Sequence, residues 1–187
     1  MSYERPEGDV VRYGDAIGLR HTATGFYLAS NEETYESGSG QQKIYCAGWD
    51  EGVSMWAVLP VEGAGDEVIG NEVGFDDQFR LKHLGTGRHL HSHPDIESPI
   101  TAQQEVSGFG GDDETDENDV WKLEMIPDQE EEEGEDYLWH LGRSVVIRHV
   151  ATGQTLHSHP IQLTEDTHEV TAFGEFDENS TWSASFE

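Results

Sequence analysis

Apolar and polar residues alternate along this chain in short runs, and the runs end at glycine, asparagine, aspartate or proline. This pattern is typical of half-buried β-strands joined by turns. The first third of the chain contains four such runs, at residues 16–21, 25–30, 43–47 and 55–61. Helical periodicity is almost absent, so the pattern predicts an all-β protein.

The pattern basic-His-x-x-Thr-Gly-x-x-Leu occurs three times, with its histidine at positions 21, 83 and 149. Its Thr-Gly pair predicts a tight turn, because glycine adopts a positive φ without steric cost. A tryptophan follows each copy, at positions 56, 121 and 182. Several separated anchors shared by three segments indicate an internal repeat.

Each repeat supplies about four strands and is too small to bury its own apolar face. The three copies are therefore expected to close around one core with pseudo-threefold symmetry, which is a β-trefoil. The whole chain, residues 1–187, is predicted to be a single domain. Its repeats are predicted at approximately residues 11–62, 72–127 and 140–187, with an acidic linker at 128–136.

Charge narrows the range of partners. Ten Lys and Arg residues against 39 Asp and Glu residues give a formal net charge of −29 at pH 7. Such a surface repels phosphate backbones and anionic lipids, so nucleic acid and membrane partners are not expected. The composition is typical of a protein that works in concentrated salt, where charge repulsion is screened. An acidic mesophilic protein is the alternative.

Cys46 is the only cysteine, which excludes an intrachain disulfide and a zinc site built on several cysteines. The first residues are polar and contain no apolar segment typical of a secretory signal. We therefore expect a cytoplasmic monomer, or a protein of the endoplasmic reticulum lumen or secreted space if the chain begins after a removed signal. No apolar run is long enough for a transmembrane helix.

The string Leu-His-Ser-His-Pro occurs twice, at 90–94 and 156–160. Alternation along a strand places leucine and serine on one face and the two histidines on the other. The first repeat keeps Leu28 and Ser30 but has Ala29 and Asn31 at the histidine positions. The Leu-x-Ser frame is therefore predicted to face the core, and the imidazoles to point outward or into a loop pocket.

Three roles for these imidazoles are open: hydrogen bonding to a ligand, anchoring of the adjacent turn, or metal binding. His91 and His93 have the spacing of a zinc-chelating pair, but a third ligand is not evident in the sequence. We therefore expect no native metal and no cofactor. His21, His83 and His149 occur in every repeat and are predicted to be structural, with the ring N–H bound to the backbone of the turn.

Two further features have structural interpretations. Trp56, Trp121 and Trp182 are predicted to be core residues, since they have a fixed place in every repeat. Trp139 is placed in the linker. The acidic segment at 112–119 resembles a cation-binding loop, but Glu117 stands where an EF-hand needs glycine, so it is interpreted as a solvated turn.

Taken in order, these motifs resemble the MIR domain over roughly residues 11–187. The matching pieces are Leu-Arg-His at 19–21, Gly-Ser-Gly-Gln-Gln at 38–42, Leu-His-Ser-His at 90–93 and 156–159, Gln-Glu-Val-Ser-Gly-Phe-Gly at 104–110, and Asn118-Asp119-x-Trp121. The MIR domain is a β-trefoil of protein O-mannosyltransferases and stromal-cell-derived-factor-2-like proteins. The resemblance implies a binding module without catalysis of its own, with glycans or glycosylated polypeptides as ligands, in proteins that enter the endoplasmic reticulum.

The leading hypothesis is thus a non-catalytic module that binds a glycan or glycosylated polypeptide beside the Leu-His-Ser-His strands of repeats two and three. The predicted ligand-binding residues are His91, His93, His157 and His159, with Arg88, Gln104 and Glu105. No Gly-x-Ser-x-Gly, Walker or His-Glu-x-x-His motif is present, and no catalytic residue is predicted. The alternatives are a protein-interaction adaptor or chaperone-associated factor and, less favoured, a metal-dependent enzyme.

Overall fold

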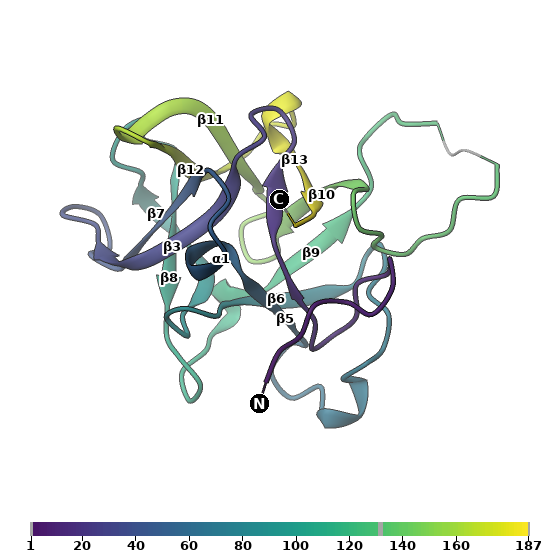
Figure 1. Ribbon diagram of the computed structural model, residues 1–187. Helices are drawn as coiled ribbons and strands as arrows, with labels where there is room; N and C mark the ends of the chain where they lie inside the picture. Colours follow the sequence, from purple (N-terminus) through teal and green to yellow (C-terminus); the bar gives the residue numbers. More distant parts are fainter. Residues whose placement is uncertain (1, 131–132, 187) are drawn as a thin grey trace.

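Short antiparallel strands are the main secondary structure of the computed structural model, which describes residues 2–130 and 133–186 (Figure 1). The first repeat contributes β1 (Ala16–Ile17), β2 (Leu19–His21), β3 (Tyr27–Thr34), β4 (Gln42–Ala47) and β5 (Trp56–Leu59). The second contributes β6 (Gln78–His83), β7 (His89–Glu97), β8 (Gln104–Phe109) and β9 (Trp121–Glu124). The third contributes β10 (Ser144–His149), β11 (Thr155–Thr164), β12 (Thr167–Phe173) and β13 (Thr181–Ala184).

Strands β1 and β2 are one strand interrupted at Gly18. A Cβ atom at Gly18 would lie 2.3 Å from the Ser185 carbonyl oxygen and 2.5 Å from the Trp49 ring, so the close approach requires glycine. Short helical turns precede the last strand of each repeat: α1 (Glu51–Ser54), η2 (Glu117–Asp119) and η3 (Glu178–Ser180). A further turn, η1 (Asp66–Val68), lies between the first and second repeats.

The strands pair in two layers. The first and last strands of the repeats form a closed antiparallel ring in the order β1, β5, β6, β9, β10, β13, β2. The middle strands form three hairpins, and their inner strands β4, β8 and β12 pair with one another around the pseudo-threefold axis. This arrangement is a β-trefoil of three four-stranded repeats, as predicted from the sequence.

Three tryptophans occupy equivalent places in the core. Trp56, Trp121 and Trp182 are all fully buried. Each indole Nε1 donates a hydrogen bond of 2.9 Å to a leucine carbonyl of its own repeat, namely Leu28, Leu90 or Leu156. The three segments therefore share one interior, with the same indole contact repeated around the axis.

Trp139 does not lie in a linker, contrary to the prediction. It is fully buried, and its ring packs against Phe79 with the centroids 5.3 Å apart. The residues just before it are also tied down, because Asp136 accepts a hydrogen bond from His140 at 2.7 Å. Residues 131–132 of the proposed linker lie outside the described residues. The acidic run at 128–136 predicts a solvated linker, but the end of this run is hydrogen-bonded to the residues that follow it.

The recurring histidines are structural, with one difference from the prediction. His83 is typical: its Nε2 donates to the Val53 carbonyl oxygen at 2.8 Å and its Nδ1 accepts from Thr86 Oγ1 at 2.9 Å. His21 and His149 make the same pair of contacts, with the Asn179 and Asn118 carbonyls. The ring N–H thus binds the helical turn of the preceding repeat in space, and the threonine of its own turn binds the other nitrogen.

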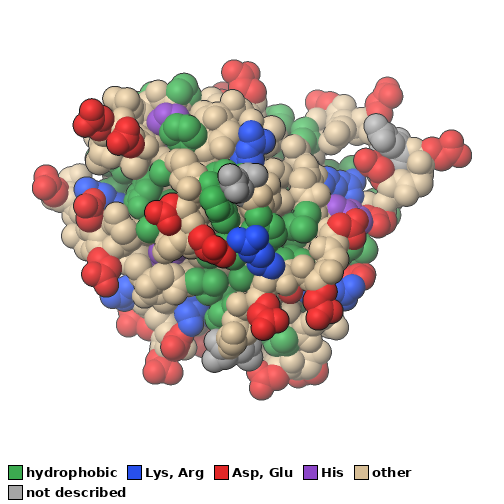
Figure 2. All heavy atoms as spheres, viewed as in Figure 1, with side chains coloured by type: hydrophobic (Ala, Val, Ile, Leu, Met, Phe, Trp, Pro, Cys, Tyr) green, Lys and Arg blue, Asp and Glu red, His purple; other side chains and the backbone are tan. Residues whose placement is uncertain are grey.

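Acidic side chains cover much of the surface, and Lys and Arg side chains are fewer (Figure 2). Among the described residues, no helix is long and apolar enough to cross a membrane.

Candidate functional site

Pseudo-threefold symmetry creates three equivalent boundaries between repeats. Two positions face each other across each boundary: the residue after the Thr-Gly turn of one repeat and a residue at the start of the third strand of its neighbour. The facing pairs are Arg88 with Gln42, Gln154 with Gln104, and Phe26 with His168. The fold is the same at all three boundaries, but the chemistry is different at each.

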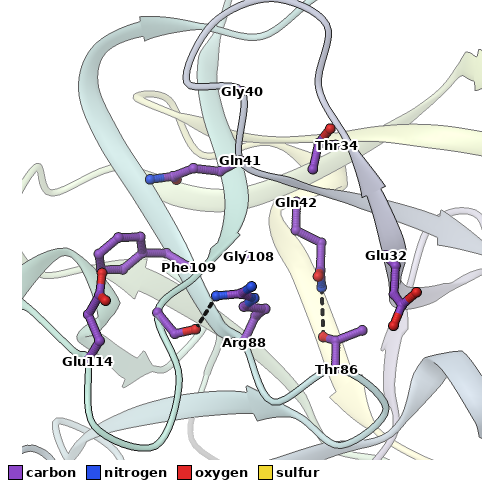
Figure 3. A pocket seen from close by; sticks show the side chains of 11 residues that line it. Glu32, Thr34, Gly40, Gln41, Gln42, Thr86, Arg88, Gly108, Phe109 and Glu114 are labelled. Atoms are coloured by element: carbon purple, nitrogen blue, oxygen red, sulfur yellow. Dashed lines mark hydrogen bonds between the residues drawn. The ribbon is translucent and has the colours of Figure 1, made fainter.

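The boundary between repeats one and two is hollowed into a cavity of about 460 Å³ (Figure 3). Arg88 lies between Phe109 and Glu114 on one side and Gln42 and Thr86 on the other (Figure 3). The remaining lining comes from the first repeat and from the end of β8. The full set is Glu32, Thr34, Gly40, Gln41, Gln42, Thr86, Arg88, Gly108, Phe109, Gly110 and Glu114.

The floor of this cavity is held by a chain of hydrogen bonds. Gln42 Nε2 donates to Ser30 Oγ at 2.8 Å and to Thr86 Oγ1 at 2.7 Å. Thr86 in turn donates its hydroxyl proton to His83 Nδ1. Because the N–H and O–H donors of the floor are engaged with one another, they fix the shape of the pocket and have no donor left for a ligand.

Arg88 is the cationic group of the cavity. Its Nη1 donates to the Gly110 carbonyl oxygen at 2.6 Å, which positions the guanidinium over the end of β8. A guanidinium has five N–H donors, so most of them remain available for a ligand. Glu32 and Glu114 place acceptor oxygens in the same cavity, and Phe109 provides an apolar ring. The cavity therefore combines donors, acceptors and an aromatic face.

A second, smaller cavity of about 310 Å³ occupies the boundary between repeats two and three. Gln104 makes the contacts that Gln42 makes in the first cavity, since its Nε2 lies 2.7 Å from Ser92 Oγ and 3.2 Å from Thr152 Oγ1. Gln154 stands at the Arg88 position, so this cavity has an amide in place of the charge.

The third boundary is filled by aromatic rings. Phe26 stacks on His168 with the ring centroids 4.3 Å apart and the planes at 12°. The two side chains occupy the space that separates Arg88 from Gln42 in the first cavity. Burial lowers the pKa of His168, with a smaller contribution from His159.

The expectation that the Leu-His-Ser-His imidazoles face outward is wrong. His91, His157 and His159 are buried, and only His93 of the four is partly exposed. Each buried ring contacts a carboxylate: His91 Nδ1 donates to Asp119 at 2.8 Å, His157 Nε2 to Asp177 at 3.0 Å, and His159 Nε2 to Glu169 at 3.2 Å. The helical turns η2 and η3 pack against β7 and β11, and both faces are buried in the first half of each strand, at residues 89–92 and 155–159.

The Leu-x-Ser frame is buried in all three repeats, as predicted. Its serines tie the second strand to the third: Ser30, Ser92 and Ser158 donate to the carbonyls of Lys43, Glu105 and Glu169.

Glu105 is a loop anchor in this structure. Its side chain is 1 % exposed, and its carboxylate accepts hydrogen bonds from the backbone N–H and the hydroxyl of Ser39. Gly38 has φ +61°, and a Cβ atom there would lie 2.1 Å from Glu105 Oε2. Glu169 holds residues 100–101 in the same way, accepting from Ile100 N at 2.8 Å and Thr101 Oγ1 at 2.5 Å. Ligand contact by a carboxylate engaged like this requires the loop to open.

The predicted ligand-binding residues are therefore not gathered in one place. Arg88 lies in the first cavity and Gln104 in the second. His91 packs behind the first cavity, with its ring 4.5 Å from that of Phe109. Sequence reasoning missed Glu32, Gln41 and Glu114. A usable signal was the varying residue after an invariant Thr-Gly turn, which is Phe26, Arg88 or Gln154.

His91 and His93, which have the spacing of a zinc-chelating pair but were not expected to hold a metal, have ring centroids 5.4 Å apart and planes tilted by 53°. Among residues 2–130 and 133–186, the group whose potential ligand atoms all lie within 4.8 Å of one another is instead His91, Asp116 and Asp119.

Comparison with known proteins matches the chain to one family. The family model of the MIR domain matches residues 33–177. A stromal cell-derived factor 2-like protein of Arabidopsis thaliana is 40 % identical over 154 residues, which is 82 % of this chain and 66 % of that protein. The chain therefore spans just under two thirds of that relative.

Comparison with solved structures finds the same kinds of protein. The crystal structure of the SDF2-like protein from Arabidopsis thaliana superimposes with a TM-score of 0.85 at 36 % identity, covering 94 % of each chain. A protein O-mannosyltransferase complex of S. cerevisiae bound to the sugar donor has a TM-score of 0.82 at 27 % identity. That similarity covers 95 % of this chain and 26 % of the yeast chain.

Proposed function

The chain belongs to the MIR domain family, and from this premise we propose that it is a non-catalytic module that binds a glycan or a glycosylated polypeptide in the cavity between repeats one and two. Its similarity to an O-mannosyltransferase and to stromal cell-derived factor 2-like proteins supports a role in a glycosylation-related process. Location in the endoplasmic reticulum lumen and a monomeric state remain predictions.

The chemistry of the first cavity carries this proposal. A sugar offers pairs of hydroxyl groups on its edges and an apolar C–H surface on its ring faces. Arg88 can donate to such hydroxyls, Glu32 and Glu114 can accept from them, and Phe109 offers a ring for the apolar face. Hydrogen bonds that involve a charged side chain are the stronger ones, and they give the orientation that separates one sugar from another.

Comparison of the three boundaries indicates that Arg88 is the main ligand-binding residue. The second cavity has the same floor but Gln154 in place of Arg88, and the third boundary is closed by Phe26 and His168. We therefore assign the main site to the first cavity, with the second as a weaker site of the same type.

The test uses Arg88→Gln, which gives the first cavity the amide of the second. Arg20→Gln is the matched control, because Arg20 is exposed on β2 and loses the same charge away from the cavity. Titration of ¹⁵N-labelled protein with mannosides and mannosylated peptides should shift the amide signals of Thr86, Phe109 and Gly110. Arg88→Gln should weaken binding about tenfold, the loss expected for one charged hydrogen bond, and Arg20→Gln should leave it unchanged.

Signal shifts that avoid this cavity, or equal losses in the two variants, would disprove the assignment. Equal affinity for mannosylated and unmodified peptides would favour the protein-interaction adaptor instead.

A further inference from the structure

Three side chains with metal-binding atoms converge behind the Phe109 wall of the first cavity. His91 projects from β7, Asp116 is the N-cap of η2, and Asp119 ends that turn. His91 Nδ1 lies 2.8 Å from Asp119 Oδ1 and 3.6 Å from Asp116 Oδ1. We propose that these three residues bind one divalent transition-metal ion of the zinc type.

Asp119 is held as a metal-binding carboxylate would be. It is fully buried, and its Oδ2 accepts hydrogen bonds from Thr115 Oγ1 at 2.7 Å and from the Asp116 backbone N–H at 3.0 Å. These bonds fix the carboxylate plane and leave Oδ1 turned toward His91 and Asp116. Outer hydrogen bonds of this kind orient the ligands of protein metal sites.

An unpartnered imidazole points at the same carboxylate. His89 is 2 % exposed, and its Nδ1 makes no hydrogen bond to any described residue. That nitrogen lies 3.7 Å from Asp119 Oδ2. A buried polar atom without a partner is costly, so its position beside a buried carboxylate needs an explanation. A cation bound by Asp119 provides one, because an imidazole nitrogen is a group that zinc attracts, although His89 is not one of the three residues whose ligand atoms converge.

The other repeats show that the fold does not require this cluster. The third repeat builds the same capped turn, in which Asp177 is the N-cap and Ser180 takes the place of Asp119. The corresponding residues are Tyr27, Ala29, Asp50 and Ser54 in the first repeat, His89, His91, Asp116 and Asp119 in the second, and Thr155, His157, Asp177 and Ser180 in the third. A hydroxyl is enough for the cap, so the buried carboxylate and the paired histidines of the second repeat serve another purpose.

The donor set selects the kind of ion. Imidazole nitrogen with two carboxylates suits zinc, cobalt or nickel, whereas calcium and magnesium need more oxygen ligands than the cluster offers. Asp116 is partly exposed, with 43 % of its side chain accessible, which gives the ion a route from solvent. The net charge of −29 raises the local concentration of cations. Coordination through His91 Nδ1 requires the neutral tautomer, so the proton that Nδ1 donates to Asp119 moves to His91 Nε2, which has no hydrogen-bond partner among the described residues.

The site has a structural consequence for the neighbouring cavity. His91 packs on Phe109, and the loop that leads from Gly110 to Glu114 ends in the turn that carries both aspartates. A bound ion would fix this loop, which forms one wall of the first cavity. The metal site itself does not depend on the proposed function.

The experiment compares two N-cap variants of the full chain. Asp116→Asn keeps the cap, because asparagine caps a helical turn as well as aspartate does, but it weakens the metal donor. Asp177→Asn is the matched control, since Asp177 caps the equivalent turn and contacts His157 where Ser180 replaces the second carboxylate. Chelator-treated protein is titrated with ZnCl₂ by calorimetry, and CoCl₂ absorbance reports the coordination geometry.

The wild type and Asp177→Asn should bind one equivalent of zinc, with a rise in melting temperature. Asp116→Asn should bind at least about tenfold more weakly, the usual loss when a metal site is impaired. His140→Asn tests the exposed group in which His140 contacts Asp9 and Asp136, and it should leave zinc binding unchanged. Absence of stoichiometric binding, loss of binding in His140→Asn, or equal losses in the two N-cap variants would overturn the proposal.

Discussion

Phe26 and His168 stack face to face across the boundary between the third and first repeats, with their ring centroids 4.3 Å apart. At the two other boundaries a glutamine faces Arg88 or Gln154, and a cavity is present. One pair of aromatic side chains thus occupies, at the third boundary, the place where the two other boundaries have a cavity.

Removal of this stack is expected to cost stability without affecting the first cavity. Phe26→Ala takes away a half-buried ring and its contact with His168, and the loss should be about 1–3 kcal/mol. Urea unfolding followed by tryptophan fluorescence measures it. Ligand affinity at the Arg88 cavity should stay at the wild-type value, and a parallel loss of affinity would show that the boundaries are coupled.

Substitution of the three recurring core tryptophans by phenylalanine is expected to lower the free energy of unfolding by similar amounts. In Trp121→Phe the Leu90 carbonyl loses its indole donor and a cavity remains, so unfolding should become easier by about 2–4 kcal/mol. Trp56→Phe and Trp182→Phe should cost similar amounts, because the contact is the same.

Trp139→Phe provides the contrast. Its Nε1 is buried without a hydrogen-bond partner among the described residues, so no hydrogen bond is lost and only the smaller ring volume counts. The loss in free energy of unfolding should therefore be smaller for Trp139→Phe than for Trp121→Phe in the same urea titration. Equal costs would mean that the indole N–H groups add nothing to stability.

Sequence reasoning predicted most of the fold because the repeated anchors have local causes. The Thr-Gly turns, the Leu-x-Ser frame and the three recurring tryptophans each keep their role within a repeat. The candidate site is harder to predict, because the side chains that contact one another there are distant in sequence. Ser39, for example, lies 66 residues from Glu105, which accepts its hydrogen bond. His91 is enclosed by Asp119, 28 residues further on, so alternation along β7 alone suggested an outward-facing ring. Trp139 was misplaced because the acidic run before it masked a core position.

The two buried glutamates should each control one loop. Glu105→Gln removes the charge that binds Ser39, so the amides of residues 37–40 should exchange hydrogen faster, by about tenfold if one charged hydrogen bond is lost. Glu169→Gln should do the same for residues 98–101. Hydrogen exchange read by mass spectrometry separates the two loops, and each variant is the control for the other. Faster exchange of both loops in either variant would indicate general destabilisation instead.

Acid is expected to destabilise the protein through its buried histidines. Burial lowers the pKa of His21 to about 4, with smaller contributions from His157, His168 and His159. Burial also lowers the pKa of His83 and His149, each opposed by a backbone hydrogen bond. The unfolded chain binds these protons near its ordinary pKa of 6.5, so it binds more protons than the folded state between pH 6.5 and about 4.

The free energy of unfolding should therefore fall as the pH is lowered from 6.5 toward 4, by on the order of 3 kcal/mol from His21. Urea titrations at several pH values measure this, and His149→Gln should flatten the slope. His140 is the contrasting case, because Asp136 raises its pKa, and its contribution is lost as the pH rises. Stability that is constant between pH 6.5 and 4 would show that these imidazoles are charged in the folded state.

Exchange of a single residue should turn the second cavity into a copy of the first. Gln154 occupies the Arg88 position above a floor that Gln104, Ser92 and Thr152 build as Gln42, Ser30 and Thr86 build the other. If the guanidinium is what makes the first cavity the main glycan site, Gln154→Arg should raise the calorimetric stoichiometry for a mannosylated peptide from one toward two. The double variant Arg88→Gln with Gln154→Arg should return to one strong site, now marked by shifted amide signals at Gln104 and Thr152. A stoichiometry that stays at one in Gln154→Arg would mean that a feature outside the symmetric frame, such as Glu114, selects the ligand.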